Sequence, residues 1–202
     1  MSKKLIGFGL VMAIAFLVAF VVGCTTTSEK VTGGREYFPN EDGYSWSYRV
    51  TFASTSETAT METTFSGTSA VDSIIVQKFI MRIIVDSFIV QEEESFLQVS
   101  DAAVLGYGSP SYPTTEAAII LDFPLEVGKK WITSGTYEAE VLAIETVPVP
   151  LGSYDDCFKI STFIGSDTPA LIWLAPNVGP VKMGMTMGTE EAVAELTYKS
   201  FQ

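Results

Sequence analysis

The chain contains few side chains that could carry out chemistry. Its 202 residues include no histidine, which excludes Ser-His-Asp and Cys-His catalysis and any metal site built on imidazole. Two cysteines are present, Cys24 and Cys157. Cys157 follows two aspartates, which would raise the pKa of its thiol, so we interpret it as a small apolar strand residue. The residues therefore predict no catalytic site, no metal site and no cofactor, and we do not expect an enzyme.

Acidic residues form three short clusters, which are the remaining candidates for metal binding or acid–base chemistry. They are Glu92–Glu94, Asp155–Asp156 and Glu190–Glu191. None has the loop spacing of a calcium site, and no spacing favours a carboxylate pair for glycoside hydrolysis. We interpret the clusters as solvated turns between strands.

Three methionines have a spacing that suits a binding surface. Met183, Met185 and Met187 occupy alternate positions, so on a β-strand they share one face. Such a face could form an adaptable wall against a hydrophobic ligand, or bind Cu(I) through thioethers. Packing in the core is the reading that the composition favours. The three are retained as candidate ligand-facing residues.

The N-terminal segment has the pattern of an export signal. Lys3 and Lys4 precede 19 uncharged residues, Leu5–Gly23, which are long enough to span a bilayer. The stretch ends in Val-Val-Gly-Cys at 21–24, and the polar segment TTTSEK follows without a cationic cluster. These features favour a cleaved signal peptide over a permanent transmembrane anchor.

The run Val21–Cys24 resembles the lipobox of bacterial lipoproteins. The resemblance implies that the Cys24 thiol receives a diacylglyceryl group and that signal peptidase II cuts between Gly23 and Cys24. It also implies an acyl group, such as palmitate, on the new amino terminus. Several acyl chains anchor a protein stably where one is marginal. We expect a signal peptide at 1–23, a lipidated cysteine and flexible tether at 24–36, and a place in the cell envelope, on the periplasmic or extracellular side of a bacterial membrane.

The charge balance limits the partners of the exported chain. Without Lys3 and Lys4, 10 basic and 24 acidic residues remain, a net charge of −14. This argues against nucleic acid, because binding to phosphates relies on Lys and Arg. The acidic surface is interpreted as keeping the protein soluble through self-repulsion, with an acidic recognition surface as the alternative. With Cys24 lipidated, Cys157 has no partner in the chain, so no disulfide scaffold is expected.

Residues 37–202 read as a single all-β domain. β-branched and aromatic residues are abundant, and turn residues recur between apolar runs. Ser73–Val85 could also form a helix, but its β-branched residues favour a strand. Gly106–Thr115, with its glycines and prolines, is predicted as a long loop. The predicted strands are Trp46–Ser54, Thr58–Ser66, Ser73–Val85, Ser95–Ser100, Ala117–Phe123, Thr136–Thr146, Cys157–Ile164, Ala170–Leu174, Val181–Met187 and Ala192–Phe201.

One nine-residue pattern occurs twice. Phe38–Trp46 and Phe123–Trp131 share F-P-x-E-x-G-x-x-W. Proline marks a strand boundary, glycine permits a tight turn, and tryptophan can enter the sheet and pack inward. The pattern predicts two similar sheet starts, arising from a duplication or from a recurrent turn.

These segments, with VPVPLGSYDDCFKI and IWLAPNVGPVKM, resemble the DUF3108 and TapB-like families of bacterial secreted proteins and lipoproteins. The resemblance spans about residues 37–200 and departs at Ser153-Tyr154, where the family often has Thr-Phe. It implies a strongly curved antiparallel sheet or half-barrel. Its motifs are turn and packing signatures, so it carries no catalytic residues.

Three functions follow, in decreasing order of support. The first is a membrane-anchored, non-enzymatic binding module for a hydrophobic ligand or an envelope partner. The second is a structural or interaction lipoprotein whose closed core holds no ligand. The third is a hydrolase. The first two differ in whether the Met183–Met187 face lines an open cavity or packs in the core.

Overall fold

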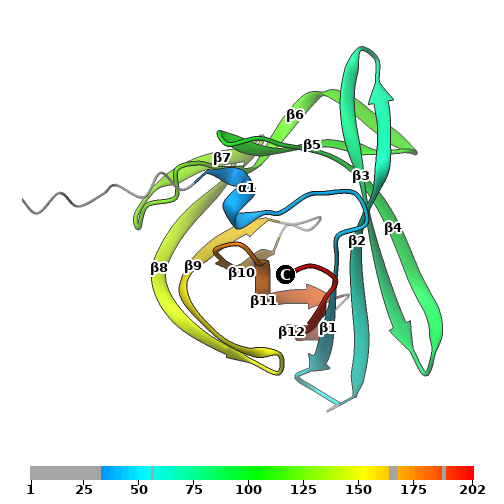
Figure 1. Cartoon of the computed structure of the whole chain (residues 1–202), viewed down its shortest axis with the longest axis vertical. Helices are drawn as coiled ribbons and strands as arrows, with labels where there is room; N and C mark the ends of the chain where they lie inside the picture. The colour runs from blue at the N-terminus through cyan, green and yellow to red at the C-terminus, as the bar shows by residue number, and fades with distance from the viewer. Residues whose placement is uncertain (1–32, 56, 164–167, 188–189) are drawn as a thin grey trace, which may run out of the picture. The chain divides into compact units, whose positions relative to one another are not determined.

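The computed structural model describes residues 33–55, 57–163, 168–187 and 190–202, and in these residues the fold is all-β (Figure 1). One short helix, α1 (Gly34–Tyr37), precedes twelve strands. The strands are β1 (Ser45–Phe52), β2 (Thr58–Val71), β3 (Ile74–Val85), β4 (Phe88–Val99), β5 (Ala103–Ser109), β6 (Tyr112–Asp122), β7 (Lys130–Ser134), β8 (Tyr137–Val149), β9 (Gly152–Phe163), β10 (Pro169–Ala175), β11 (Gly179–Met187) and β12 (Glu190–Lys199). The all-β fold class predicted from the sequence is confirmed.

The described strands form a single, strongly curved antiparallel sheet that is nearly closed into a barrel. Its order is β6-β5-β4-β3-β2-β1-β12-β11-β10-β9-β8-β7. The chain thus builds two consecutive six-stranded meanders, β1–β6 and β7–β12, which are joined where β1 pairs with β12. At the other seam β6 and β7 lie side by side, and the Trp131 indole N–H donates to the Ile119 carbonyl oxygen across it (3.2 Å).

The repeated F-P-x-E-x-G-x-x-W pattern opens both meanders with the same turn. In the first, the Gly43 N–H donates to the carbonyl of Phe65 (2.9 Å), whose own N–H donates to Tyr44 (3.0 Å). In the second, the Gly128 N–H donates to the carbonyl of Val141 (2.8 Å), whose N–H donates to Lys129 (3.0 Å). Both glycines take the left-handed backbone conformation, with φ of 84° and 88°, which glycine adopts without steric cost.

The core fills the inside of the curved sheet. The two pattern tryptophans, Trp46 and Trp131, are buried in it. The chain before β1 also contributes, because Tyr37 packs edge-on against Phe158 and Phe38 contacts Phe65. At α1, a Cβ on Gly34 would lie 2.0 Å from the Ser100 carbonyl oxygen, so only glycine fits there. The chain therefore closes its own interior with the segment that leads into the sheet.

Most predicted strands are confirmed, including β3 in place of a helix over Ser73–Val85. The predicted long loop over Gly106–Thr115 is wrong, because β5 and β6 meet in a hairpin there. Gly108 takes a φ of 77° and pairs with Pro113 at the hairpin end. Turn-forming residues at the two strand ends resemble a loop in the sequence. The strands β5 and β7 are absent from the prediction, and β4 begins at Phe88, seven residues before the predicted Ser95.

Candidate functional site

The predicted anchor residues, Gly23 and Cys24, lie outside the described residues. The helix α1 includes the last three positions of the predicted tether, Gly34–Glu36. The Gly34 N–H donates to the Asp101 carbonyl oxygen (3.1 Å), so the chain is held against the β4–β5 turn from that point. No helix in the described part of the chain is both long and apolar enough to cross a bilayer.

The methionine face lies on the inner side of β11. Met183 pairs with Ala194 and Met185 with Ala192, and both alanines are buried. The two methionine side chains are half-buried and pack against the core. The side chain of Met187 lies outside the described part of the structure. Met183 and Met185 therefore share one face, as predicted, and that face is packed.

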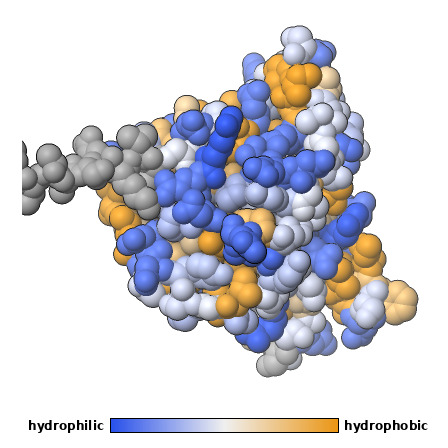
Figure 2. Space-filling model, in the orientation of Figure 1, coloured by the Kyte–Doolittle hydropathy of each residue, from blue (hydrophilic) through white to orange (hydrophobic). Residues whose placement is uncertain are grey.

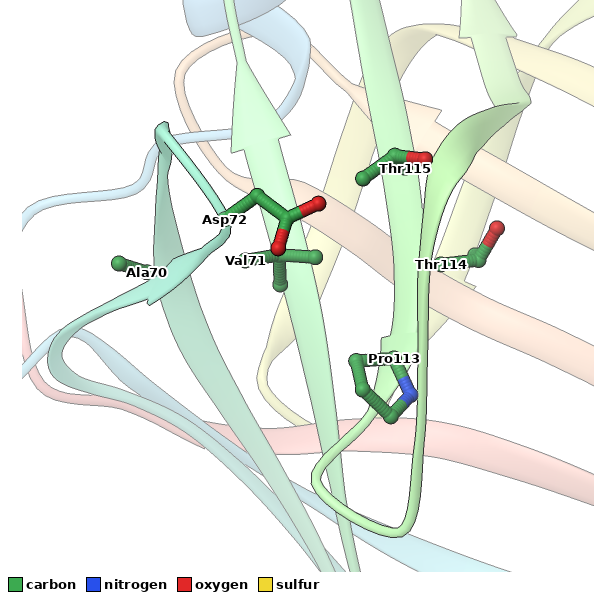
Figure 3. Close-up of a pocket in the computed structure, with 6 residues that line it drawn as sticks. All are labelled: Ala70, Val71, Asp72, Pro113, Thr114 and Thr115. Carbon is green, nitrogen blue, oxygen red and sulfur yellow. The ribbon is translucent and has the colours of Figure 1, made fainter.

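Two hollows on the described surface are lined by other residues than Met183 and Met185. One, of about 430 Å³, lies between the β2–β3 turn and the start of β6 (Figure 3) and is lined by Ala70–Asp72 and Pro113–Thr115. The other, of about 330 Å³, lies over β1 and β12, next to Phe52 and Val193. Both are partly open to solvent. The interior face of β11 opens into neither.

The thiol of Cys157 is buried in β9. Burial raises its pKa to about 11, and the nearby Asp155, Asp156 and Glu145 carboxylates add to the rise against a backbone hydrogen bond with Val147, which lowers it. The thiol donates to the Tyr154 carbonyl oxygen (3.3 Å). A protonated, buried thiol is a poor nucleophile, so this geometry does not provide thiolate chemistry at neutral pH.

The acidic clusters were predicted as turns, and this prediction is wrong. Glu92–Glu94 lie within β4, Asp155–Asp156 within β9, and Glu190–Glu191 begin β12. Short runs of charge resemble turns in a sequence, but long twisted strands with two solvated faces also hold them. Among the described residues no three His, Cys, Asp or Glu side chains gather in a way that could hold a metal ion.

One exposed feature was not recognised in the sequence. The β3–β4 hairpin presents large apolar side chains to solvent at its end, and Figure 2 shows this projecting end as a hydrophobic area at the lower right. The exposed fractions are 74% for Phe88, 56% for Ile89 and 61% for Val90. The signal was present as apolar runs on both sides of Asp86-Ser87 with no polar alternation. The predicted strands Ser73–Val85 and Ser95–Ser100 leave out Phe88–Val90, which the structure places at the start of β4.

No protein-family model and no curated protein matches the chain. Two solved structures share its fold. The "putative exported protein with YmcC-like fold" from Bacteroides fragilis is 13% identical, with a TM-score of 0.51 over 82% of this chain and 99% of that one. A "putative lipoprotein" from Parabacteroides distasonis is 14% identical, with a TM-score of 0.50 over 85% of this chain and 100% of that one. These likenesses establish the fold. The comparisons name neither the DUF3108 nor the TapB-like family.

Proposed function

We propose that this protein is a cell-envelope lipoprotein, anchored through lipid on Cys24, whose β domain is a non-enzymatic interaction module with a closed core. The observation that carries the choice of module is the packing of Met183 and Met185 against the core. This was the feature that separated an open ligand cavity from a closed interior. The proposal therefore adopts the second of the functions considered above and retains the envelope partner of the first.

The filled interior supports a partner on the outside of the domain. Sites for small apolar ligands are concave pockets of about 300–1,000 Å³ with mostly apolar walls. The 430 Å³ hollow on this surface is open and is lined by Asp72 and two threonines beside apolar groups. Tyr37 and Phe38, from the segment before β1, are buried in the core that fills the inside of the curved sheet.

The proposed anchor rests on the sequence at Val21–Cys24. It is supported by the printed names of the two structural neighbours, one of which is called exported and the other a lipoprotein. The proposed absence of catalysis rests on the lack of histidine and on the high pKa of the Cys157 thiol. Nucleic acid is excluded from the proposal by the net charge.

Mass spectrometry of the protein purified from its native host tests the anchor. We expect a mature chain beginning at Cys24 with a diacylglyceryl thioether, and a Cys24→Ser variant that keeps the leader and lacks lipid. A mature chain that begins at Met1, or a free thiol at Cys24, would contradict the proposal.

Solvent extraction of the same preparation tests the closed core. We expect the extract to contain no lipid at one molecule per chain, apart from the lipid covalently attached to Cys24. We also expect an apolar fluorescent probe to bind the folded protein no more than it binds the unfolded protein. A lipid recovered at one per chain, and lost on replacing Met183 and Met185 by Glu, would restore the ligand-carrying alternative.

A further inference from the structure

One edge of β4 has no neighbouring strand over most of its length. On one side β4 pairs with β3 from Phe88 to Leu97. On the other side β5 pairs with Leu97–Val99 only. Within the described residues, the backbone from Phe88 to Phe96 therefore has no strand on its second side. Such an edge presents alternate N–H and C=O groups that can receive another strand.

The first six residues of this edge stand clear of the core, whereas Phe96 at its other end is buried. The six residues Phe88–Glu93 are exposed in succession. A strand packed on one side alternates between buried and exposed positions, so solvent reaches both faces of this end. In Figure 1 the β3–β4 turn lies at the lower right, away from α1 at the upper left.

The edge has two chemical parts. Phe88–Val90 are apolar and exposed, and Val85 lies opposite Phe88 on β3. Glu92–Glu94 follow directly. Glu92 forms an ion pair with Arg82 (2.6 Å), whereas none of the ion pairs found among the described residues involves Glu93 or Glu94. A complementary strand would place apolar side chains at one end and cations at the other.

The fold itself does not require this open edge. β10 holds the corresponding fourth position in the second meander, and it pairs with β9 over Pro169–Leu174 and with β11 over Leu171–Ala175. Its last four residues are all buried. The fourth strand can thus be paired on both sides, and the first meander leaves it open.

We propose that the free edge of β4, Phe88–Phe96, binds an extended segment of a partner protein, apolar where it meets Phe88–Val90 and basic where it meets Glu92–Glu94. The segment adds a strand to the sheet, so backbone hydrogen bonds supply affinity and side chains supply specificity. This inference names the partner chemistry of the interaction module and rests on the proposed function.

Other occupants fit the edge less well. A bilayer surface with anionic lipids would repel Glu92–Glu94, and the hairpin end lies away from α1, where the described chain begins. A second copy of this chain would bring two β4 acidic clusters together in a protein that already carries a net charge of −14 without its leader. A partner segment with positive charge would avoid both kinds of electrostatic repulsion.

Labelled synthetic peptides test the proposal against the full lipidated chain in neutral detergent. The probe is a nine-residue peptide with Lys at three positions at one end and Val and Ile at the other, made in both sequence directions. One control has Glu for Lys, and another is N-methylated at alternate amides. We expect fluorescence anisotropy to show binding of the Lys peptide in one direction, weakened at least tenfold by either control change.

Matched protein variants locate the binding site. Glu93→Lys with Glu94→Lys should weaken the Lys peptide at least tenfold, whereas Glu190→Lys with Glu191→Lys, the same charge change on β12, should leave it within about twofold. Phe88→Ser should weaken peptide binding severalfold, and Tyr112→Ser, at the exposed end of the β5–β6 hairpin, should not. Circular dichroism confirms that each variant is folded.

Four other outcomes overturn the inference. Equal binding of the Lys and Glu peptides, or no binding, would leave Glu92–Glu94 only as charges that prevent edge pairing. A blue shift of a Phe88→Trp variant on phosphatidylcholine nanodiscs, without peptide binding, would make the bilayer the occupant. A dimer in sedimentation that Ile89→Pro abolishes would make it a second copy. If protein purified from the native host lacks lipid on Cys24 and still binds the peptide, the proposed anchor is wrong and the docking edge stands.

Discussion

The two six-stranded meanders begin alike and diverge at their fourth strands. Gly43 and Gly128 make equivalent backbone hydrogen bonds. Trp46 and Trp131, which follow these two turns, are both buried in the core. β10 in the second meander is paired on both sides and mostly buried, whereas β4 in the first is open along one edge and begins with the exposed apolar residues Phe88–Val90. The two halves thus share the structure of their opening turns. They differ in the fourth strand, which has an unpaired edge only in the first half.

The similarity extends beyond the repeated sequence pattern. Each half runs as six successive antiparallel strands from an equivalent turn, and the halves meet at β1 with β12 and at β6 with β7. A recurrent turn alone would not place equal strand numbers on both sides. Of the two origins left open by the sequence, the strand order favours duplication.

The largest expected effects concern the two tryptophans of the opening turns. Trp46 is 1% exposed and donates to the Val178 carbonyl oxygen (2.7 Å), whereas Trp131 is 7% exposed and its bond is longer. We expect Trp46→Ala to lower the free energy of unfolding by about 4–5 kcal/mol and Trp131→Ala by about 3 kcal/mol. Urea unfolding of the full chain measures both.

Phenylalanine variants at the same two positions keep most of the ring and remove the N–H donor. Each should recover more than half of the loss seen with alanine. If Trp46→Ala and Trp131→Ala lowered the free energy of unfolding equally, the two halves would depend on their tryptophans to the same degree. That result would contradict the larger loss expected for Trp46 from its deeper burial.

The next comparison is between the fourth strands. Leu174 in β10 is fully buried, so Leu174→Ala should cost about 3 kcal/mol of unfolding free energy. Ile89 in β4 is 56% exposed, so Ile89→Ala should change it by less than about 0.5 kcal/mol. Denaturant midpoints of the two variants give the difference. A large loss at Ile89 would mean that the hairpin end packs against something in the isolated protein, and the docking edge would be wrong.

The sequence predicted the fold class and most strands because apolar runs, β-branched residues and turn residues agree locally. It also identified both opening turns, since Pro, Gly and Trp each have a specific backbone or packing role there. It misplaced Glu92–Glu94 and the Gly106–Thr115 hairpin because charge and glycine occur both in loops and in twisted strands. The open edge of β4 could not be predicted, since it depends on where β5 stops pairing, which no residue pattern within β4 specifies.

A smaller and equal effect is expected at the two turn glycines. A Cβ at Gly43 or Gly128 would meet no atom within 4 Å, so alanine there suffers only the left-handed backbone strain, about 1–2 kcal/mol. Thermal unfolding of Gly43→Ala and Gly128→Ala should therefore give losses within about 0.5 kcal/mol of each other. Unequal losses would mean that the turns, though alike in hydrogen bonding, are not equivalent in strain.

The smallest expected change in unfolding free energy concerns the residue after each turn glycine, where the two halves make different contacts. Tyr44 stacks on Phe201, with ring centroids 4.3 Å apart, whereas Lys129 donates to the carbonyl oxygens of Asp122 and Pro124 (2.9 and 3.0 Å). Lys129 also forms an ion pair with the Asp122 carboxylate (3.1 Å), and its side chain is 23% exposed. Because these contacts together hold the turn, Lys129→Met should cost about 1 kcal/mol of unfolding free energy.

Its neighbour Lys130 provides the matched control. The Lys130 side chain is 49% exposed and contacts only the exposed carboxylates of Glu138 and Glu140 among the ion pairs of the described residues. Lys130→Met should therefore cost less than about 0.5 kcal/mol, and adding salt to the wild-type protein should reduce even that contribution. If Lys130→Met cost as much as Lys129→Met, the carbonyl bonds of Lys129 would not be what holds the second turn. The second turn would then depend on Gly128 and Trp131, without the help that Tyr44 gives the first turn by stacking on Phe201.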